Sequence, residues 1–135
     1  MNIILYLSKK ETEAGARLIN KISSNFYYEN IEVFDHMDNF KKRIHSFPRK
    51  IDVAVILTVD STQLSDILEI KEALEDMEII LILPDQDKDT VSKGMTLYPR
   101  FLAYTDSDFD DVSAVLGKLG SRRIAENTSL NRNMA

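Results

Sequence analysis

Apolar runs of strand length alternate with segments of helical spacing along most of the chain. Each run spans four or five residues that are apolar throughout or alternate with polar ones, which is typical of strands. Each following segment places apolar residues three or four positions apart, which is typical of amphipathic helices. The predicted strands are residues 3–7, 31–34, 53–57, 79–83 and 101–104.

Polar residues at the start of the intervening segments predict where the helices begin. A side chain with a partner three residues later can cap the free amides of a first helical turn. Three pairs have this spacing: Ser8 and Glu11, Asp60 and Gln63, and Ser107 and Asp110. Pro48 is expected to end the second helix, Gly94 a short fourth helix over roughly residues 88–93, and Gly120 the fifth.

Five β–α units in strict alternation imply an α/β fold with a parallel sheet between two helical layers. The runs 3–7, 53–57 and 79–83 are apolar throughout, as central strands are, whereas 31–34 alternates and 101–104 is short, as edge strands often are. This pattern favours the strand order 2-1-3-4-5, a three-layer αβα sandwich of the flavodoxin-like type. We expect one domain over residues 1–120 and a polar C-terminal extension over 121–135.

Composition narrows the function classes. The 135 residues carry a formal net charge of −5, which disfavours nucleic-acid binding. The one basic triplet, Lys41-Lys42-Arg43, is interpreted as part of the solvent-exposed face of a helix. The chain has no cysteine, and its two histidines, His36 and His45, lack metal-ligand spacing. The apolar start is too short for a membrane span and lacks the order of a secretory signal, so we expect a cytoplasmic protein without membrane contact.

In such a sheet, ligands bind beyond the carboxyl ends of the strands, where the strand order reverses. The candidate contacts for an anionic group there are Ser8, Lys9, Lys10, Thr58, Asp60 and Thr105. The helix N-termini at this edge favour anions. However, the glycine-rich phosphate loops of dinucleotide folds and P-loop proteins are absent from the sequence.

The chain resembles the receiver (CheY-like) family of response regulators over roughly residues 2–120. The resemblance is carried by the run Ile51–Leu57, which is similar to the third strand of a receiver, and by Gly94 through Phe101-Leu102, followed by Asp106 and an amphipathic helix. It implies the flavodoxin-like fold already expected and a role in signalling.

The resemblance also implies where the phosphorylation residues would stand. A phosphorylatable receiver has an acidic pair for magnesium, an acceptor aspartate, and a Ser/Thr and a lysine that contact the phosphate. In this chain these positions fall on Leu7, Ser8 and Lys9, on Leu57 or Thr58, on Leu83 or Pro84, and on Tyr104 or Thr105. Leucine cannot accept a phosphoryl group. We therefore expect a degenerate receiver that is not an enzyme and holds no cofactor or metal.

One alternative keeps a cation at this edge. Asp60, Asp85, Asp87 and Asp106 could converge as a shifted metal site. Equally, Asp60 could cap a helix and the others lie in solvated loops, because aspartate is common in both roles.

A second surface suggests protein contacts. Met95, Leu97, Tyr98, Phe101 and Tyr104 lie around the fourth helix and fifth strand, and receivers commonly engage partners through the face formed by the fourth helix, fifth strand and fifth helix. The leading hypothesis is a receiver-like interaction domain that docks a protein partner or a second copy without phosphorylation. The alternatives are a binder or enzyme for a small anionic ligand at the strand ends, and a structural subunit of an assembly.

Overall fold

The computed structural model describes residues 1–7, 12–46 and 50–121. They form a five-stranded parallel sheet with the order β2-β1-β3-β4-β5, which confirms the predicted topology. The strands are β1 (Asn2–Leu7), β2 (Asn30–Phe34), β3 (Val53–Leu57), β4 (Glu78–Leu83) and β5 (Phe101–Tyr104). Each begins and ends within one residue of its predicted bounds, because uniform apolar runs leave little freedom in where a buried strand lies.

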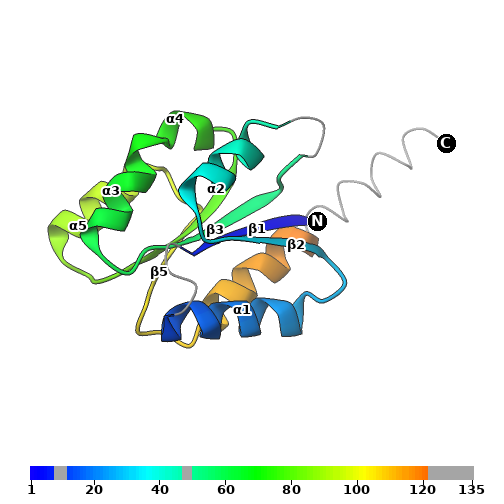
Figure 1. Cartoon of the computed structure of the whole chain (residues 1–135). Helices are drawn as coiled ribbons and strands as arrows, with labels where there is room; N and C mark the ends of the chain where they lie inside the picture. Colours follow the sequence, from blue (N-terminus) through cyan, green and yellow to red (C-terminus); the bar gives the residue numbers. More distant parts are fainter. Residues whose placement is uncertain (8–11, 47–49, 122–135) are drawn as a thin grey trace.

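Two helical layers cover the sheet (Figure 1). The helices are α1 (Glu13–Asn25), α2 (Met37–Ile44), α3 (Ser61–Glu69), α4 (Lys71–Leu74) and α5 (Lys88–Met95), and the described residues 110–121 are also helical. We call residues 110–121 the C-terminal helix. This helix and α1 lie on one face of the sheet, whereas α2, α3, α4 and α5 lie on the other, so the αβα sandwich is confirmed.

Two hydrophobic clusters hold these layers to the sheet. Successive residues of the central strands point alternately into one cluster and the other. In β1, Ile3 and Leu5 belong to the cluster under α1 and the C-terminal helix, whereas Ile4 and Tyr6 belong to the cluster under the other helices. Tyr6 stacks on Phe40 of α2 with ring centroids 4.7 Å apart. Because both faces are buried, the central strands have to be apolar at every position, which is what their sequence shows.

The basic triplet of α2 was predicted to lie on the solvent-exposed face of the helix, and this is only partly correct. Lys41 and Lys42 are exposed, but Arg43 is buried. Its Nε donates to both carboxylate oxygens of Glu32 on the edge strand β2, at 2.9 and 3.2 Å. One N–H shared between both carboxylate oxygens is a bifurcated hydrogen bond, and the opposite charges of the two groups strengthen it. Arg43 therefore joins α2 to the edge of the sheet.

The structure confirms one of the three predicted helix caps and contradicts the other two. Asp60 accepts a hydrogen bond from the backbone amide of Gln63 at 2.9 Å, as predicted. α1, however, starts at Glu13 with Thr12 as its cap, so the predicted start at Ser8 and Glu11 is wrong, and both of those residues lie outside the described ranges. The pairing of Ser107 with Asp110 is also wrong. Ser107 instead accepts from the amide of Phe109, and Asp108 from that of Asp110.

The helix end predicted at Gly94 is correct to within one residue, whereas the last helix does not end at Gly120. α5 continues past Gly94 to Met95, and the C-terminal helix continues through Gly120 to residue 121. A Cβ on Gly94 would lie 3.1 Å from the side chains of Leu81 and Leu83 of β4. The absent side chain thus lets α5 approach the sheet closely. The predicted end of the second helix at Pro48 lies outside the described residues.

The segment after β3 holds two helices where one was predicted. α3 ends at Glu69, and α4 begins at Lys71 after Ile70, whose φ and ψ of −108° and 18° are not helical. The amide of Ile70 donates to the carbonyl of Ile67, which tightens the end of α3. The apolar spacing continues through this break, so the sequence pattern alone did not reveal it.

Candidate functional site

The carboxyl ends of four neighbouring strands meet at one edge of the sheet (Figure 1). The register places Leu7 of β1 beside Leu57 of β3, and Leu57 beside Ile82 of β4. The candidate residues Thr58, Asp60 and Thr105 follow these strands. Ser8, Lys9 and Lys10 lie outside the described residues, so their part in a site at this edge stays a prediction.

Leu57 is the residue at which the sequence resemblance led us to expect the acceptor of a phosphorylatable receiver. Its side chain is 1% exposed and belongs to the hydrophobic cluster beneath α1, together with Leu7 and Ile82. A charged carboxylate would be desolvated in this position, at a cost of several kcal/mol. This point of the edge is therefore part of the core.

Thr58, the residue that would take the acceptor position after a one-residue slip, is also fully buried. Its backbone amide and its hydroxyl both donate to the carbonyl of Ile82, at 3.0 and 2.8 Å. The hydroxyl thus ties the end of β3 to β4. Using it for a ligand would leave that buried carbonyl with one partner fewer.

Asp60 and Gln63 close the start of α3 reciprocally. Asp60 accepts from the amide of Gln63, and the side-chain oxygen of Gln63 accepts from the amide of Val59 at 2.8 Å. This arrangement satisfies two amides that a helix start leaves without partners. The Asp60 carboxylate is therefore engaged in holding the loop after β3.

The other acidic residues of this edge lie in separate loops. Asp85 accepts from the amide of Asp87 at 3.0 Å, which is an ordinary aspartate turn, and Asp106 is exposed after β5. Within the described residues, no three His, Asp or Glu side chains are placed to hold a metal ion together. The four aspartates that could have formed a shifted metal site do not converge.

At the end of β5 the structure brings in a residue that sequence reasoning missed. Arg17 of α1 donates from Nη2 to the carbonyl of Thr105, and its guanidinium lies 5.3 Å from the ring centre of Phe109. Thr105 itself donates to the carbonyls of Leu83 and, from its hydroxyl, of Pro84. A cation thus lies beside Thr105, where the resemblance led us to expect a lysine, but it comes from α1 and binds the backbone.

Nothing in the sequence pattern singles out Arg17. It directly precedes the buried Leu18 in an amphipathic helix, where an arginine is usually a surface residue. Only the packing of α1 against the segment after β5 places its guanidinium beside Phe109. Within the described chain its Nε is buried and has no hydrogen-bond partner.

A shallow polar cleft of about 540 Å³ lies between α1 and the start of the C-terminal helix, lined by Arg17, Asn20, Lys21, Ser24, Asn25 and Asp108. Lys21 forms an ion pair with Asp110 at this cleft. The hydrogen bond and charge of Asp110 raise the pKa of Lys21, and the same hydrogen bond lowers the pKa of Asp110. Opposite charges satisfy each other here, so the cleft presents no unbalanced charge for an anion.

The predicted interaction residues divide into exposed and buried members. Tyr98 is 91% exposed and Met95 50%, whereas Leu97 is buried. Phe101 and Tyr104 are half-buried and pack against the two opposite hydrophobic clusters. Two of the five side chains are thus available for a large contact, and three mainly serve the core.

The chain has the CheY-like variant of the flavodoxin fold. A crystal structure of a response regulator from Thermotoga maritima superposes on the chain with a TM-score of 0.63, covering 90% of this chain and 98% of the other at 13% sequence identity. No protein-family model and no curated protein matches the sequence. At this identity the match demonstrates the fold, and the fold alone.

The sequence also predicted that the chain has no membrane span. None of the helices in the described ranges is both long and apolar enough to cross a membrane.

Proposed function

We propose that this chain is a receiver-like regulatory domain that acts through protein–protein contacts and is not controlled by aspartyl phosphorylation. The observation that carries the proposal is the burial of Leu57 at the acceptor position, 1% exposed between Leu7 and Ile82. A receiver fold that keeps its sheet and helices but replaces its acceptor with a core leucine retains its surfaces for binding. Function then resides in those surfaces.

The side chains at the strand ends support this proposal. The hydroxyls of Thr58 and Thr105 donate to backbone carbonyls, and Asp60 accepts from a helix amide. The two hydroxyls would have to break internal hydrogen bonds to donate to a phosphoryl group. Reagents that mimic phosphate should therefore find no prepared site among them.

The partner would dock on the face formed by α5, β5 and the C-terminal helix, which corresponds to the face that receivers commonly use. β5 is an edge strand, so one side of its backbone is not paired with another strand of the sheet. Met95 and Tyr98, both well exposed, flank the path from α5 to this strand. A protein partner or a second copy of the chain could engage them.

The direct test incubates the full chain with acetyl phosphate and magnesium and measures its intact mass, with an active receiver treated in parallel. We expect the active receiver to gain one phosphoryl group and this chain to gain none. A phosphoryl adduct that disappears in Asp60→Ala or Asp85→Ala would overturn the proposal.

The alternative, a binder of small anions at the strand ends, depends on Ser8, Lys9 and Lys10, which the structure does not describe. A thermal-shift screen with nucleotides and phosphorylated metabolites tests it. A ligand present at about 100 times its dissociation constant should stabilise the fold by about 2.7 kcal/mol. A stabilisation that is lost in a Lys9→Met, Lys10→Met double variant would support this alternative.

A further inference from the structure

A hollow opens at the edge of the sheet opposite the strand carboxyl ends. It has a volume of about 260 Å³ and is lined by Lys71, Glu75, Met77, Thr96, Leu97 and Tyr98. Met77 directly precedes β4, and the other wall follows α5 and precedes β5. The hollow thus lies between α4 and the loop after α5, with the apolar side chains of Met77 and Leu97 in its lining.

The fold does not explain the tyrosine at its rim. Tyr98 is 91% exposed, so its ring contributes little to the core. Its φ of 49° lies in the left-handed region, where glycine or asparagine fits with least strain. Neither packing nor backbone geometry favours a large aromatic side chain here. An exposed tyrosine beside a hollow is instead typical of the residues that anchor protein contacts.

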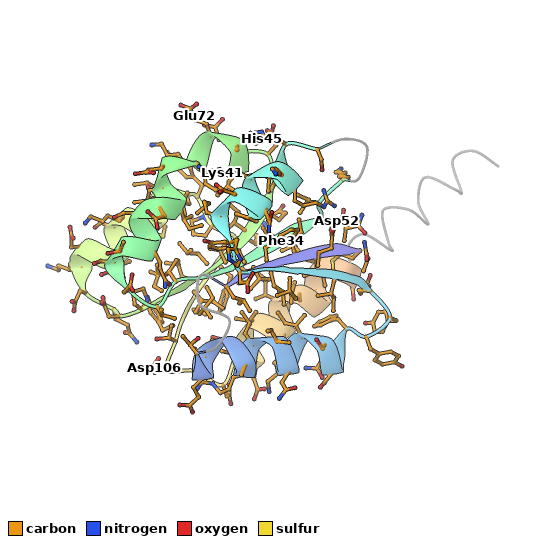
Figure 2. All side chains as sticks on the ribbon, in the orientation of Figure 1. Phe34, Lys41, His45, Asp52, Glu72 and Asp106 are labelled. Carbon is orange, nitrogen blue, oxygen red and sulfur yellow. The ribbon has the colours of Figure 1, made fainter. Side chains whose placement is uncertain are left out.

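The surface beside the hollow is strongly acidic. Residues 69–78 contain five acidic residues and one lysine, a net charge of −4 within a chain whose total is −5. None of the ion pairs among the described residues involves this segment. Figure 2 shows Glu72 at the outer surface of α4. Charge that is not neutralised within the fold is available to attract a partner.

We propose that this surface, the hollow with Tyr98 and the acidic segment 69–78, docks a lysine- or arginine-rich polypeptide segment that places an apolar side chain in the hollow. The inference rests on the proposed function as an interaction domain and assigns the chemistry of the partner. Basic side chains complement the segment of charge −4, and an arginine or lysine can also stack on the Tyr98 ring. A second copy would instead bring two such acidic segments together.

The test uses a defined probe, because the natural segment is unidentified. The probe is a fluorescein-labelled peptide in which the sequence Leu-Lys-Lys-Leu-Leu-Lys-Leu is repeated twice, and the counter-probe replaces each lysine with glutamate. We expect the lysine peptide to bind the full chain and the glutamate peptide not to bind. Backbone amide chemical shifts should change mainly within residues 71–77 and 95–98.

Substitutions distinguish binding at the hollow and the acidic segment from nonspecific electrostatic attraction. Tyr98→Ser and the double reversal Glu72→Lys, Glu75→Lys should each weaken binding at least about tenfold, as expected for an anchor residue and for complementary charge. The matched control for the single reversal Glu72→Lys is Glu13→Lys. It makes the same charge change on α1, in the opposite helical layer, and should weaken binding less than Glu72→Lys does and less than about threefold.

Three results would overturn the inference: shift changes spread evenly over all acidic surfaces, equal effects of the single reversals Glu13→Lys and Glu72→Lys, or a homodimer in sedimentation that Tyr98→Ser dissociates. Failure of the inference is distinct from failure of the proposed function. The proposed function is tested by the phosphoryl mass measurement, which needs no peptide. Peptide binding that maps to β5 and the C-terminal helix would contradict the surface inferred here but would remain consistent with a role in protein–protein interaction.

Discussion

Leu57 of β3 lies in register between Leu7 of β1 and Ile82 of β4, and all three side chains are buried in one cluster. Leu57, where the sequence resemblance led us to expect a phosphate acceptor, is a packing position in this structure. Substitutions at Leu57 should consequently be measured as changes in stability.

We expect Leu57→Ala to lower the free energy of unfolding by about 2–5 kcal/mol, because it removes buried methyl groups and leaves a cavity. Leu57→Met, which keeps the volume, should cost less than about 1.5 kcal/mol. Urea unfolding followed by circular dichroism measures both. Equal, small losses for the two variants would contradict the placement of Leu57 in the core.

Restoring an acid at this position should not restore phosphorylation. Leu57→Asp places a carboxylate in the apolar cluster, so burial should raise its pKa and destabilise the fold by several kcal/mol at neutral pH. The loss relative to the wild type should shrink on acidification, because the protonated acid costs less to bury. Leu57→Asn, which does not titrate, is the control. Acetyl phosphate treatment of a folded Leu57→Asp variant should yield no adduct.

Two acidic residues before helices offer a matched comparison of capping. Asp60 accepts a hydrogen bond from the amide of Gln63, whereas Asp87, in the same position before α5, makes no such bond from its side chain. Asp60→Ala should therefore cost about 1 kcal/mol and Asp87→Ala clearly less. Chemical denaturation of both variants tests this difference. A larger loss at Asp87 would show that the cap at Asp60 contributes little.

Two helical glycines should respond oppositely to alanine. A Cβ at Gly117 of the C-terminal helix meets nothing within 4 Å, so Gly117→Ala should stabilise the protein by about 0.5–1 kcal/mol through helix propensity. At Gly94 the same change meets Leu81 and Leu83 at 3.1 Å, and we expect the gain to be lost or reversed. Thermal unfolding of the two variants measures the contrast.

The ion pair of Lys21 and Asp110 should contribute stability over a defined pH window. The lowered pKa of Asp110 means that its contribution is present above the ordinary value of 3.8 and is lost as the pH falls through the lower folded value. The raised pKa of Lys21 means that its contribution is present below 10.5 and is lost as the pH rises through the higher folded value. Both groups are exposed, so the effect should be small and should weaken in high salt.

A double-mutant cycle of Lys21→Met and Asp110→Asn isolates this pair, since it removes the effect of Asp110 on the start of the C-terminal helix. The coupling should be favourable at neutral pH and low ionic strength. It should vanish in acid and in strong alkali. Coupling that is independent of pH would contradict an ionic interaction between the two side chains.

The local sequence was sufficient for some features of the site and insufficient for others. The Asp60–Gln63 cap was predictable because both partners lie within one helical turn. The start of α1 at Thr12 was not, because Ser8 and Thr12 both precede an acidic residue and an apolar stripe, and local spacing does not choose between them. The roles of Arg17 and Arg43 depend on partners 88 and 11 residues away, Thr105 and Glu32, which no local pattern reveals.

The sequence by itself determined the five strands, their order and the two-faced burial of the sheet, because apolar periodicity reports directly on which side of an element faces a core. It also predicted that Leu57 ends a central strand, which the structure confirms. Only the tertiary structure decided that Thr58 is bound to Ile82, that Gly94 serves close packing, and that Tyr98 stands exposed beside a hollow and an acidic segment. These features arise between elements distant in the chain, and their partners are set by packing.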